Sequence, residues 1–199
     1  MGERTFKAAC VLYRLFSRKM NVEWAEPFQE GPCVFVVNNA GVAGAVDMMA
    51  RFPQKDRIHP WILEEMLEKR EYPIPPAILK GTPYIPVYRD QRFILTLRQS
   101  IRVLQKDHYL MLFPEQTPGG RETHRWINTG WLRLGEMWYH ASGRALKMYP
   151  VHVDKNKHLI KVAAPVRYDP AKRFTEQEKE LVEKLSAGLR GEPLAAVSS

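Results

Sequence analysis

Five consecutive apolar residues, Cys33 to Val37, constrain the fold more than any other part of the sequence. A run of this length has the size of a strand, and its lack of polar positions indicates burial on both faces, which is typical of parallel sheets. Tyr109 to Phe113 is a second such run, and segments with helical spacing of apolar residues lie between the runs. Because short strands alternate with helical segments, the sequence predicts an α/β domain with a mostly parallel central sheet flanked by helices.

The expected elements are short and separated by turns. Helices are predicted over residues 43–51, 61–70, 93–104 and 129–140, and from Thr175, which forms a capping box with Glu178, to about Leu189. Strands are predicted over residues 33–37, 84–88, 109–113, 146–153 and 159–166. The last two strands are expected to form a hairpin at one edge of the sheet, across the polar turn 154–158.

A basic amphipathic helix is expected at the start of the chain, over residues 1–22. Phe6, Tyr13 and Phe16 fall on one face at 100° per residue, while Lys7 and Arg14 fall on the opposite face. Such a helix either lies on an anionic membrane surface or docks on the protein's own core. The rest of the 199 residues is expected to form one α/β domain over residues 23–190 and a flexible tail over residues 191–199.

The charge of the chain favours anionic partners. Lys and Arg exceed Asp and Glu by a net +8, a bias that fits nucleic acid, an anionic membrane or a phosphorylated substrate. No recognisable DNA- or RNA-binding motif accompanies the charge, so no nucleic-acid partner is expected. No apolar run is long enough to span a membrane. Cys10 and Cys33 follow no secretory signal, which favours the cytoplasm.

Three turns follow predicted strands and are the places where chemistry is expected. They cover residues 38–47, 89–90 and 114–121. In open α/β sheets ligands bind beyond the carboxyl ends of the strands, where such turns meet. No His, Cys, Asp and Glu cluster has the spacing of a metal site, and no metal is expected.

The order and spacing of these turns resemble those of the glycerolipid acyltransferase family, which includes the lysophosphatidic acid acyltransferases. The family pattern is a strand ending in Asn-His-x4-Asp, an extended Gly-x-Ile-x-Val-x-Arg, a strand running into Phe-Pro-Glu-Gly-Thr-Arg-Ser, and a late Pro-Val strand. The corresponding segments here are Val36-Val37-Asn38-Asn39, Tyr84-Ile85-Pro86-Val87-Tyr88-Arg89, Phe113-Pro114-Glu115-Gln116-Thr117 and Tyr149-Pro150-Val151. The resemblance extends from about residue 13 to residue 166.

The resemblance implies a site in which the family histidine is a general base and the aspartate orients it. Here Asn39 occupies the position of the histidine, and an amide cannot act as a base. Gly44 stands where the aspartate is expected, and Asp47 follows three residues later. His124, after the third turn, is the most suggestive substitute base; an ordinary solvated loop residue is the alternative.

Substrate binding is implied for the second and third turns. Arg89 occupies the position of the family arginine that binds the acceptor's phosphate; the alternative is a surface ion pair with Asp90 or another carboxylate. Glu115 and Thr117 match the third motif, although Glu115 could instead cap a helix. Pro118 replaces the motif's arginine, and Arg121 is the expected stand-in.

Two functions follow from the resemblance. The first is transfer of a fatty acyl group from an acyl thioester to a lysophospholipid or similar hydroxyl in phospholipid synthesis, on the cytoplasmic face of a membrane. The donor would be acyl-coenzyme A or acyl carrier protein as a substrate, with no cofactor. The second is a catalytically inactive relative that binds phospholipid or partners an active acyltransferase, which the replacement of the histidine by Asn39 favours.

Overall fold

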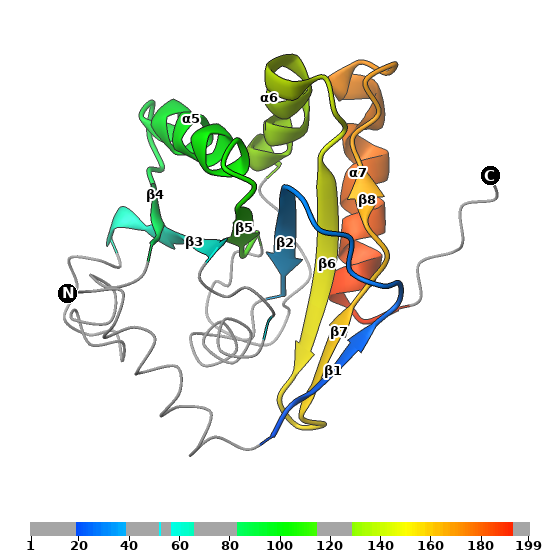
Figure 1. The fold of residues 1–199 in the computed structure, drawn as a ribbon. Coiled ribbons are helices and arrows are strands. Elements are labelled where there is room, and N and C mark those ends of the chain that lie inside the picture. The colour runs from blue at the N-terminus through cyan, green and yellow to red at the C-terminus, as the bar shows by residue number, and fades with distance from the viewer. Residues whose placement is uncertain (1–18, 39–51, 53–56, 66–82, 115–128, 193–199) are drawn as a thin grey trace.

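The structure, a computed structural model, describes residues 19–38, 52, 57–65, 83–114 and 129–192 (Figure 1). Its strands are β1 (Asn21–Trp24), β2 (Cys33–Val37), β3 (Ile58–Leu63), β4 (Ile85–Val87), β5 (Tyr109–Leu112), β6 (Lys147–Asp154), β7 (Leu159–Val162) and β8 (Val166–Arg167). Its helices are α5 (Phe93–Leu104), α6 (Arg133–Ser142) and α7 (Phe174–Leu189), and a 3-10 turn, η2 (Gly130–Leu132), precedes α6.

The strands form one eight-stranded sheet in the order β1-β7-β6-β2-β5-β3-β4, with β8 paired to β6. The central strand β2 runs parallel to both neighbours, and its Phe35 is in register with Met111 of β5 and Tyr149 of β6. Strand β7 pairs antiparallel with β6, which confirms the expected hairpin. The hairpin does not form the edge of the sheet, because β1 pairs with the outer side of β7. The α/β fold with a mostly parallel central sheet is therefore confirmed.

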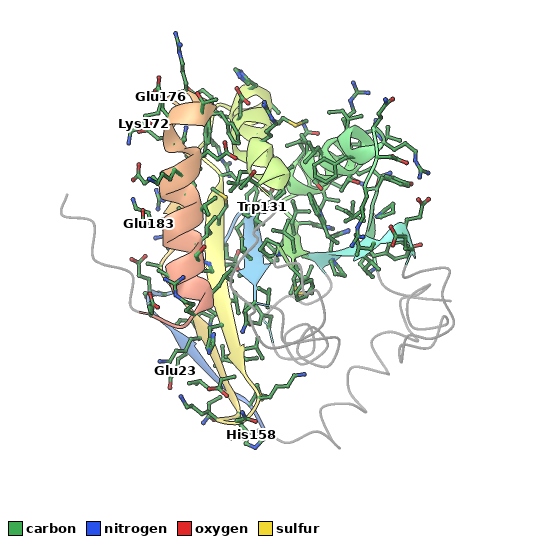
Figure 2. All side chains as sticks on the ribbon, turned by 180° about the vertical axis from the view of Figure 1, so that it is seen from behind. Glu23, Trp131, His158, Lys172, Glu176 and Glu183 are labelled. Atoms are coloured by element: carbon green, nitrogen blue, oxygen red, sulfur yellow. The ribbon has the colours of Figure 1, made fainter. Side chains whose placement is uncertain are left out.

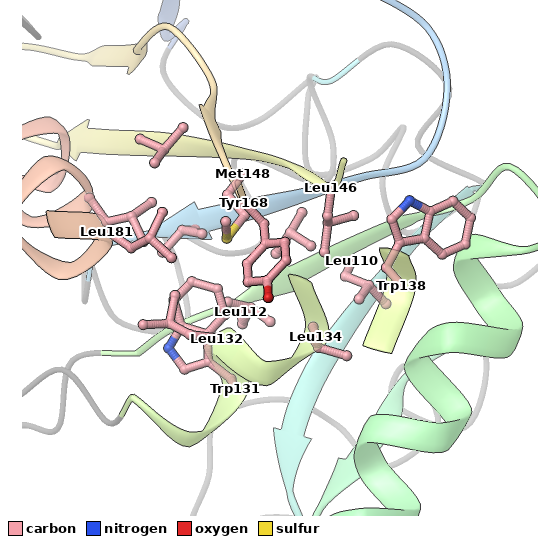
Figure 3. Packing of buried hydrophobic residues seen from close by; sticks show 14 of the residues in the cluster. Leu110, Leu112, Trp131, Leu132, Leu134, Trp138, Leu146, Met148, Tyr168 and Leu181 are labelled. Carbon is pink, nitrogen blue, oxygen red and sulfur yellow. The ribbon is translucent and has the colours of Figure 1, made fainter. Parts of the chain in front are cut away.

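Alternate residues of the central strands enter two separate cores. Val34 and Val36 of β2 face α5, α6 and α7, in a cluster with Leu97, Trp138 and Leu185 from these helices (Figure 3). Phe35, between the two valines, faces the opposite side of the sheet. There it joins a group of aromatic rings whose centroids lie 4.9–6.5 Å apart: Trp24, Phe28, Phe35, Phe52, Tyr109 and Tyr149. Burial on both faces explains why β2 contains no polar residue.

The prediction of a helix over residues 61–70 is wrong at its start. Residues 61–63 belong to β3, where Trp61 is in register with Ile85 of β4 and His59 with Leu110 of β5. Pairing with strands on both sides outweighs the helical propensity of the segment. Residues 66–70 lie outside the described part of the chain, as does the helix expected over residues 43–51.

The start of the domain also differs from expectation. Strand β1, which the sequence did not predict, takes in residues 21 and 22, the last two positions assigned to the amphipathic helix, and pairs parallel with β7. Residues 1–18 of that expected helix lie outside the described residues. The four residues of β1 alternate between exposed and half-buried, a weak signal for an edge strand.

The remaining elements match with small changes in their bounds. Helix α7 begins at Phe174, and its first turn is capped by Glu176, whose Oε2 accepts a hydrogen bond from the Arg173 backbone N–H at 3.1 Å. The predicted capping box of Thr175 and Glu178 is therefore wrong by two positions. The strand expected over residues 159–166 is divided into β7 and β8, both paired with β6. The expected flexible tail lies almost entirely outside the described residues.

Candidate functional site

The three turns of interest leave the same edge of the sheet. Strands β2, β5, β3 and β4 are neighbours in this order and run parallel. Their carboxyl ends lead into Asn38, Pro114 and Arg89, where the three predicted turns begin. Because β2 and β4 are three strand positions apart, the first and second turns begin on the order of 14 Å from each other. We call this the carboxyl edge.

Of the site residues expected from the sequence, the structure describes Arg89. The others lie outside the described residues, and their arrangement stays a prediction: Asn39, Asp47, Glu115, Thr117, Arg121 and His124. The structure therefore shows where the turns that carry these residues begin, and all of them begin at the carboxyl edge.

The first turn is anchored to β6 by Asn38. Its Oδ1 accepts a hydrogen bond from the Val153 N–H at 2.8 Å, and its Nδ2 donates to the Val153 carbonyl at 3.3 Å. One side chain thereby satisfies both backbone groups of a β6 residue beyond the end of β2. This pairing fixes the point from which the turn carrying Asn39 starts.

His152 lies beside Asn38 and was not selected by sequence reasoning. Its Nδ1 is 2.7 Å from the carbonyl oxygen of Leu189 at the end of α7. A carbonyl only accepts, so Nδ1 carries the proton and Nε2 is left as the acceptor of the neutral ring. The neighbouring Asn38 Nδ2, 3.4 Å from Nδ1, is also a donor, and that approach is not a hydrogen bond. The sequence gives no sign of this histidine, because its neighbours Asn38 and Leu189 are far from it along the chain.

Two arginines, Arg89 in the second turn and Arg92 between this turn and α5, have different surroundings. Arg92 donates through Nε to both oxygens of Asp90, at 3.1 and 3.0 Å, and through Nη2 to Glu64 at 2.9 Å. Its guanidinium lies 4.4 Å from the ring centroid of Tyr88. The hydrogen bonds from Arg92 hold the pKa of the Asp90 carboxyl below its usual value. Arg92 therefore stabilises the second turn by joining it to Glu64, the residue after β3.

Arg89 is far less engaged. Its nearest carboxylate is Glu65, with 3.8 Å between Nη1 and Oε2, and the two side chains are 59% and 57% exposed. Of the two interpretations of Arg89, the surface ion pair is thus present, though with Glu65 and not with Asp90. A separation this long between exposed groups contributes little stability. The guanidinium fork keeps hydrogen-bond donors available for an external anion.

A buried donor lies in η2, the first described helical turn after the third turn. Trp131, in η2, is 3% exposed and belongs to the same cluster as Leu112, the last residue of β5 (Figure 3). Figure 2 labels it on the inner side of the helices, in contrast to Lys172, Glu176 and Glu183. Among the described residues, its indole Nε1–H is the buried side-chain polar group that lacks a hydrogen-bond partner. Leaving such a donor unpaired costs about 1–3 kcal/mol, and it can bind an acceptor atom without breaking an existing bond.

The residues that the structure describes contain neither a candidate metal site nor a candidate membrane-spanning helix. These residues hold no group of three or more His, Cys, Asp and Glu side chains suited to a metal ion. None of the helices among them has the length and apolar character needed to cross a membrane.

The comparisons with known proteins bear on the fold. The sequence matches no protein-family model and no curated protein. The structure is similar to the crystal structure of the 1-acyl-sn-glycerophosphate (LPA) acyltransferase PlsC from Thermotoga maritima, with a TM-score of 0.59 and 15% sequence identity. The similarity covers 96% of this chain and 77% of that one. The chain therefore has an acyltransferase-like α/β fold.

Proposed function

We propose that this protein transfers a fatty acyl group from an acyl thioester to the hydroxyl of a lysophospholipid or of a related glycerol phosphate. The observation that carries the proposal is the similarity of nearly the whole fold to a lysophosphatidic acid acyltransferase. The resemblance of the three turns to the motifs of that family supports it, because in this fold those turns start from one edge of the sheet.

In this reaction the acceptor oxygen attacks the thioester carbonyl. A carbon–oxygen bond forms, the carbon–sulfur bond breaks, and the hydroxyl proton passes to a base and then to the leaving thiolate. Arg89, with Thr117 and Arg121, would hold the acceptor's phosphate beside the reacting groups, and Glu115 would line the same substrate site. Acyl-coenzyme A or acyl carrier protein would be the donor, and no cofactor is required.

The base is the part of the site that departs from the family. Asn39 cannot take the proton, so His124 is the proposed substitute base. Asp47 remains a candidate catalytic residue, although Asn39 offers it no imidazole to orient. Without a base, orientation of the reactants and stabilisation of the oxyanion would supply the rate. The loss of general base catalysis costs about 10²- to 10⁴-fold.

A second candidate function is supported by Asn39 itself. A relative that keeps the fold and Arg89 but lacks the histidine could bind phospholipid without turnover, or act together with an active acyltransferase. In either case we propose that the protein works at the cytoplasmic face of an anionic membrane, which it would reach through the amphipathic helix predicted for the residues before β1.

Release of free thiol from an acyl thioester, measured with and without lysophosphatidic acid, separates the two functions. Acceptor-dependent release by the native protein, abolished in His124→Gln, is expected for an enzyme with a displaced base. The Asn39→His variant is the matched control, and increased release from it would place residue 39 at the reacting groups. A folded native protein that binds the lipid but releases no thiol would contradict catalysis and leave the phospholipid-binding function.

A further inference from the structure

The outward side of α5 combines exposed apolar side chains with arginines. Ile94 and Leu95 are 44% and 43% exposed, and they are the large hydrophobic residues that stand out from the surface among the described residues. They are consecutive and lie in the first turn of the helix. Isolated exposed hydrophobic residues are ordinary, but two adjacent ones at the end of a helix form a local apolar surface.

The same side of the helix carries uncompensated positive charge. Arg98 and Arg102 follow Ile94 at intervals of four residues, so the three side chains lie along one line of the helix surface. Both arginines are exposed, and neither makes an ion pair with any residue that the structure describes. Helix α5 contains no acidic residue. We call Ile94, Leu95, Arg98 and Arg102 the α5 outer face.

The inner side of α5 explains why this face is left outward. Leu97 and Leu104 enter the core under the helix, while Thr96 Oγ1 donates to the Pro86 carbonyl at 2.8 Å and Ser100 Oγ accepts from the Trp61 indole at 3.0 Å. The helix is therefore fixed against β3 and β4 through its other side. Rotation about its axis to bury Ile94 and Leu95 would break these contacts.

The α5 outer face also lies close to the second turn of the candidate site. The Phe93 N–H donates to the Asp90 carbonyl at 2.9 Å, so the helix starts directly from the turn that holds Arg89. Arg92 is neutralised by Asp90 and Glu64, whereas Arg89 is only loosely paired. An anionic surface that covers the α5 outer face would therefore also reach Arg89, which lies beside the start of the helix.

From this arrangement we infer that the α5 outer face docks on an anionic phospholipid bilayer. Ile94 and Leu95 enter the interface between headgroups and acyl chains, and Arg98 and Arg102 bind lipid phosphates with their stems along the apolar boundary. Charge complementarity and the projecting apolar pair favour a bilayer. The inference rests on the proposed function in one respect, since the acceptor is itself a membrane lipid that Arg89 would reach at headgroup depth.

Co-sedimentation with vesicles tests this docking surface. The full chain is mixed with vesicles of phosphatidylcholine alone, or of an equal mixture with phosphatidylglycerol. The double variants are Ile94→Ser with Leu95→Ser, and Arg98→Gln with Arg102→Gln. The control, Lys155→Gln with Lys161→Gln, removes the same charge from exposed positions on β7 and the turn before it. Thermal unfolding should be the same in all of these proteins, because the altered side chains are exposed.

We expect each neutralised arginine to weaken partitioning onto the anionic vesicles about fivefold, the equivalent of about 1 kcal/mol, and the loss to shrink as salt is added. The apolar variant should weaken it by a similar factor, with the control close to native. Equal binding of variants and control would overturn the docking surface. So would a change of oligomeric state in the variants by light scattering, because it would show that the face contacts a second copy.

Thiol release with a short-chain, water-soluble lysophosphatidic acid separates this inference from the proposed function. The α5 variants should keep the native rate with that acceptor and lose rate only with a vesicle-bound one. Absence of release by the native protein, together with weaker vesicle binding by the variants, would contradict acyl transfer and leave the α5 outer face as a membrane contact.

Discussion

His59 Nε2 lies 2.8 Å from His108 Nδ1, and the two ring centroids are 5.1 Å apart. One proton lies between the two nitrogens, as in a hydrogen bond between neutral rings. If both rings were protonated, both nitrogens would carry a proton and the two positive charges would repel each other. Burial, followed by the charges of His108 and Lys106, lowers the pKa of His59 to about 4. Burial and the charges of Arg57 and Lys106 also lower the pKa of His108, against a smaller opposing effect of Asp107.

The pair predicts a loss of stability in acid. The ordinary pKa of His59 is 6.5, so between pH 6.5 and about 4 the unfolded chain binds a proton that the folded chain rejects. The stabilising effect of the neutral ring is complete above pH 6.5 and is lost as the pH falls through 4. The free energy of unfolding should fall between pH 7 and pH 4, and we expect His59→Gln to make this fall smaller by about 1–3 kcal/mol, measured by urea unfolding at the two pH values. His140→Gln, at an exposed position, is the control; equal acid loss in both variants would contradict the role of the pair.

Asn38 predicts a stability effect at the carboxyl edge. Alanine at this position leaves the N–H and carbonyl of Val153 without their partners, and we expect a loss of about 1–3 kcal/mol in the free energy of unfolding. Urea titration measures the loss. Asn156→Ala, in the exposed β6–β7 turn, should cost little. Equal effects of the two substitutions would mean that Asn38 does not hold the first turn.

Arg89 predicts an effect on binding without one on stability. Its exposed, 3.8 Å ion pair with Glu65 contributes little to folding, so Arg89→Ala should unfold like the native protein. If Arg89 binds the acceptor's phosphate, the variant should bind lysophosphatidic acid about 10- to 100-fold more weakly by calorimetric titration. Arg167→Ala removes the same charge from an exposed position on β8. Unchanged binding in Arg89→Ala would exclude this arginine from the site.

Gly188 predicts that α7 tolerates no side chain where it crosses β6. A methyl group at this position would overlap Pro150, with 2.8 Å to its Cγ. Although alanine is favoured over glycine in helices by about 1 kcal/mol, we expect Gly188→Ala to destabilise the protein by about 1–3 kcal/mol in thermal unfolding. Gly143→Asn is the control. The backbone there has a φ of +70°, which asparagine adopts, and a Cβ added at this position would meet no atom within 4 Å beyond its chain neighbours. A fully stable Gly188→Ala protein would show that α7 can move away from β6.

The sheet could be predicted where a strand's own residues determine its burial. Cys33 to Val37 is apolar throughout because both faces are covered, and this alone indicates a central parallel strand. Strand β3 could not be found in this way: its residues are compatible with a helix, and the partners on either side, β4 and β5, decide its conformation.

The sequence predicted where on the sheet the candidate site lies. It did not predict which side chains contact one another there. Strand order places the turns that begin at Asn38 and Arg89 on one side, as the pattern of strands and turns predicted. The neighbours of His152 and the unpaired indole of Trp131 arise from segments far apart in the chain. No spacing of residues along the sequence indicates either one.

The pairing of β1 with β7 has a consequence for the synthesis of the protein. Asn21 to Trp24 leave the ribosome well before their partners, Leu159 to Val162, are translated. Residues Leu181 to Leu189 of α7, which cover the helical side of the sheet, follow even later. Until these segments emerge, the nascent chain exposes the unpaired strand β1 and the apolar face of the sheet that α7 covers. This exposure slows folding and favours association with chaperones.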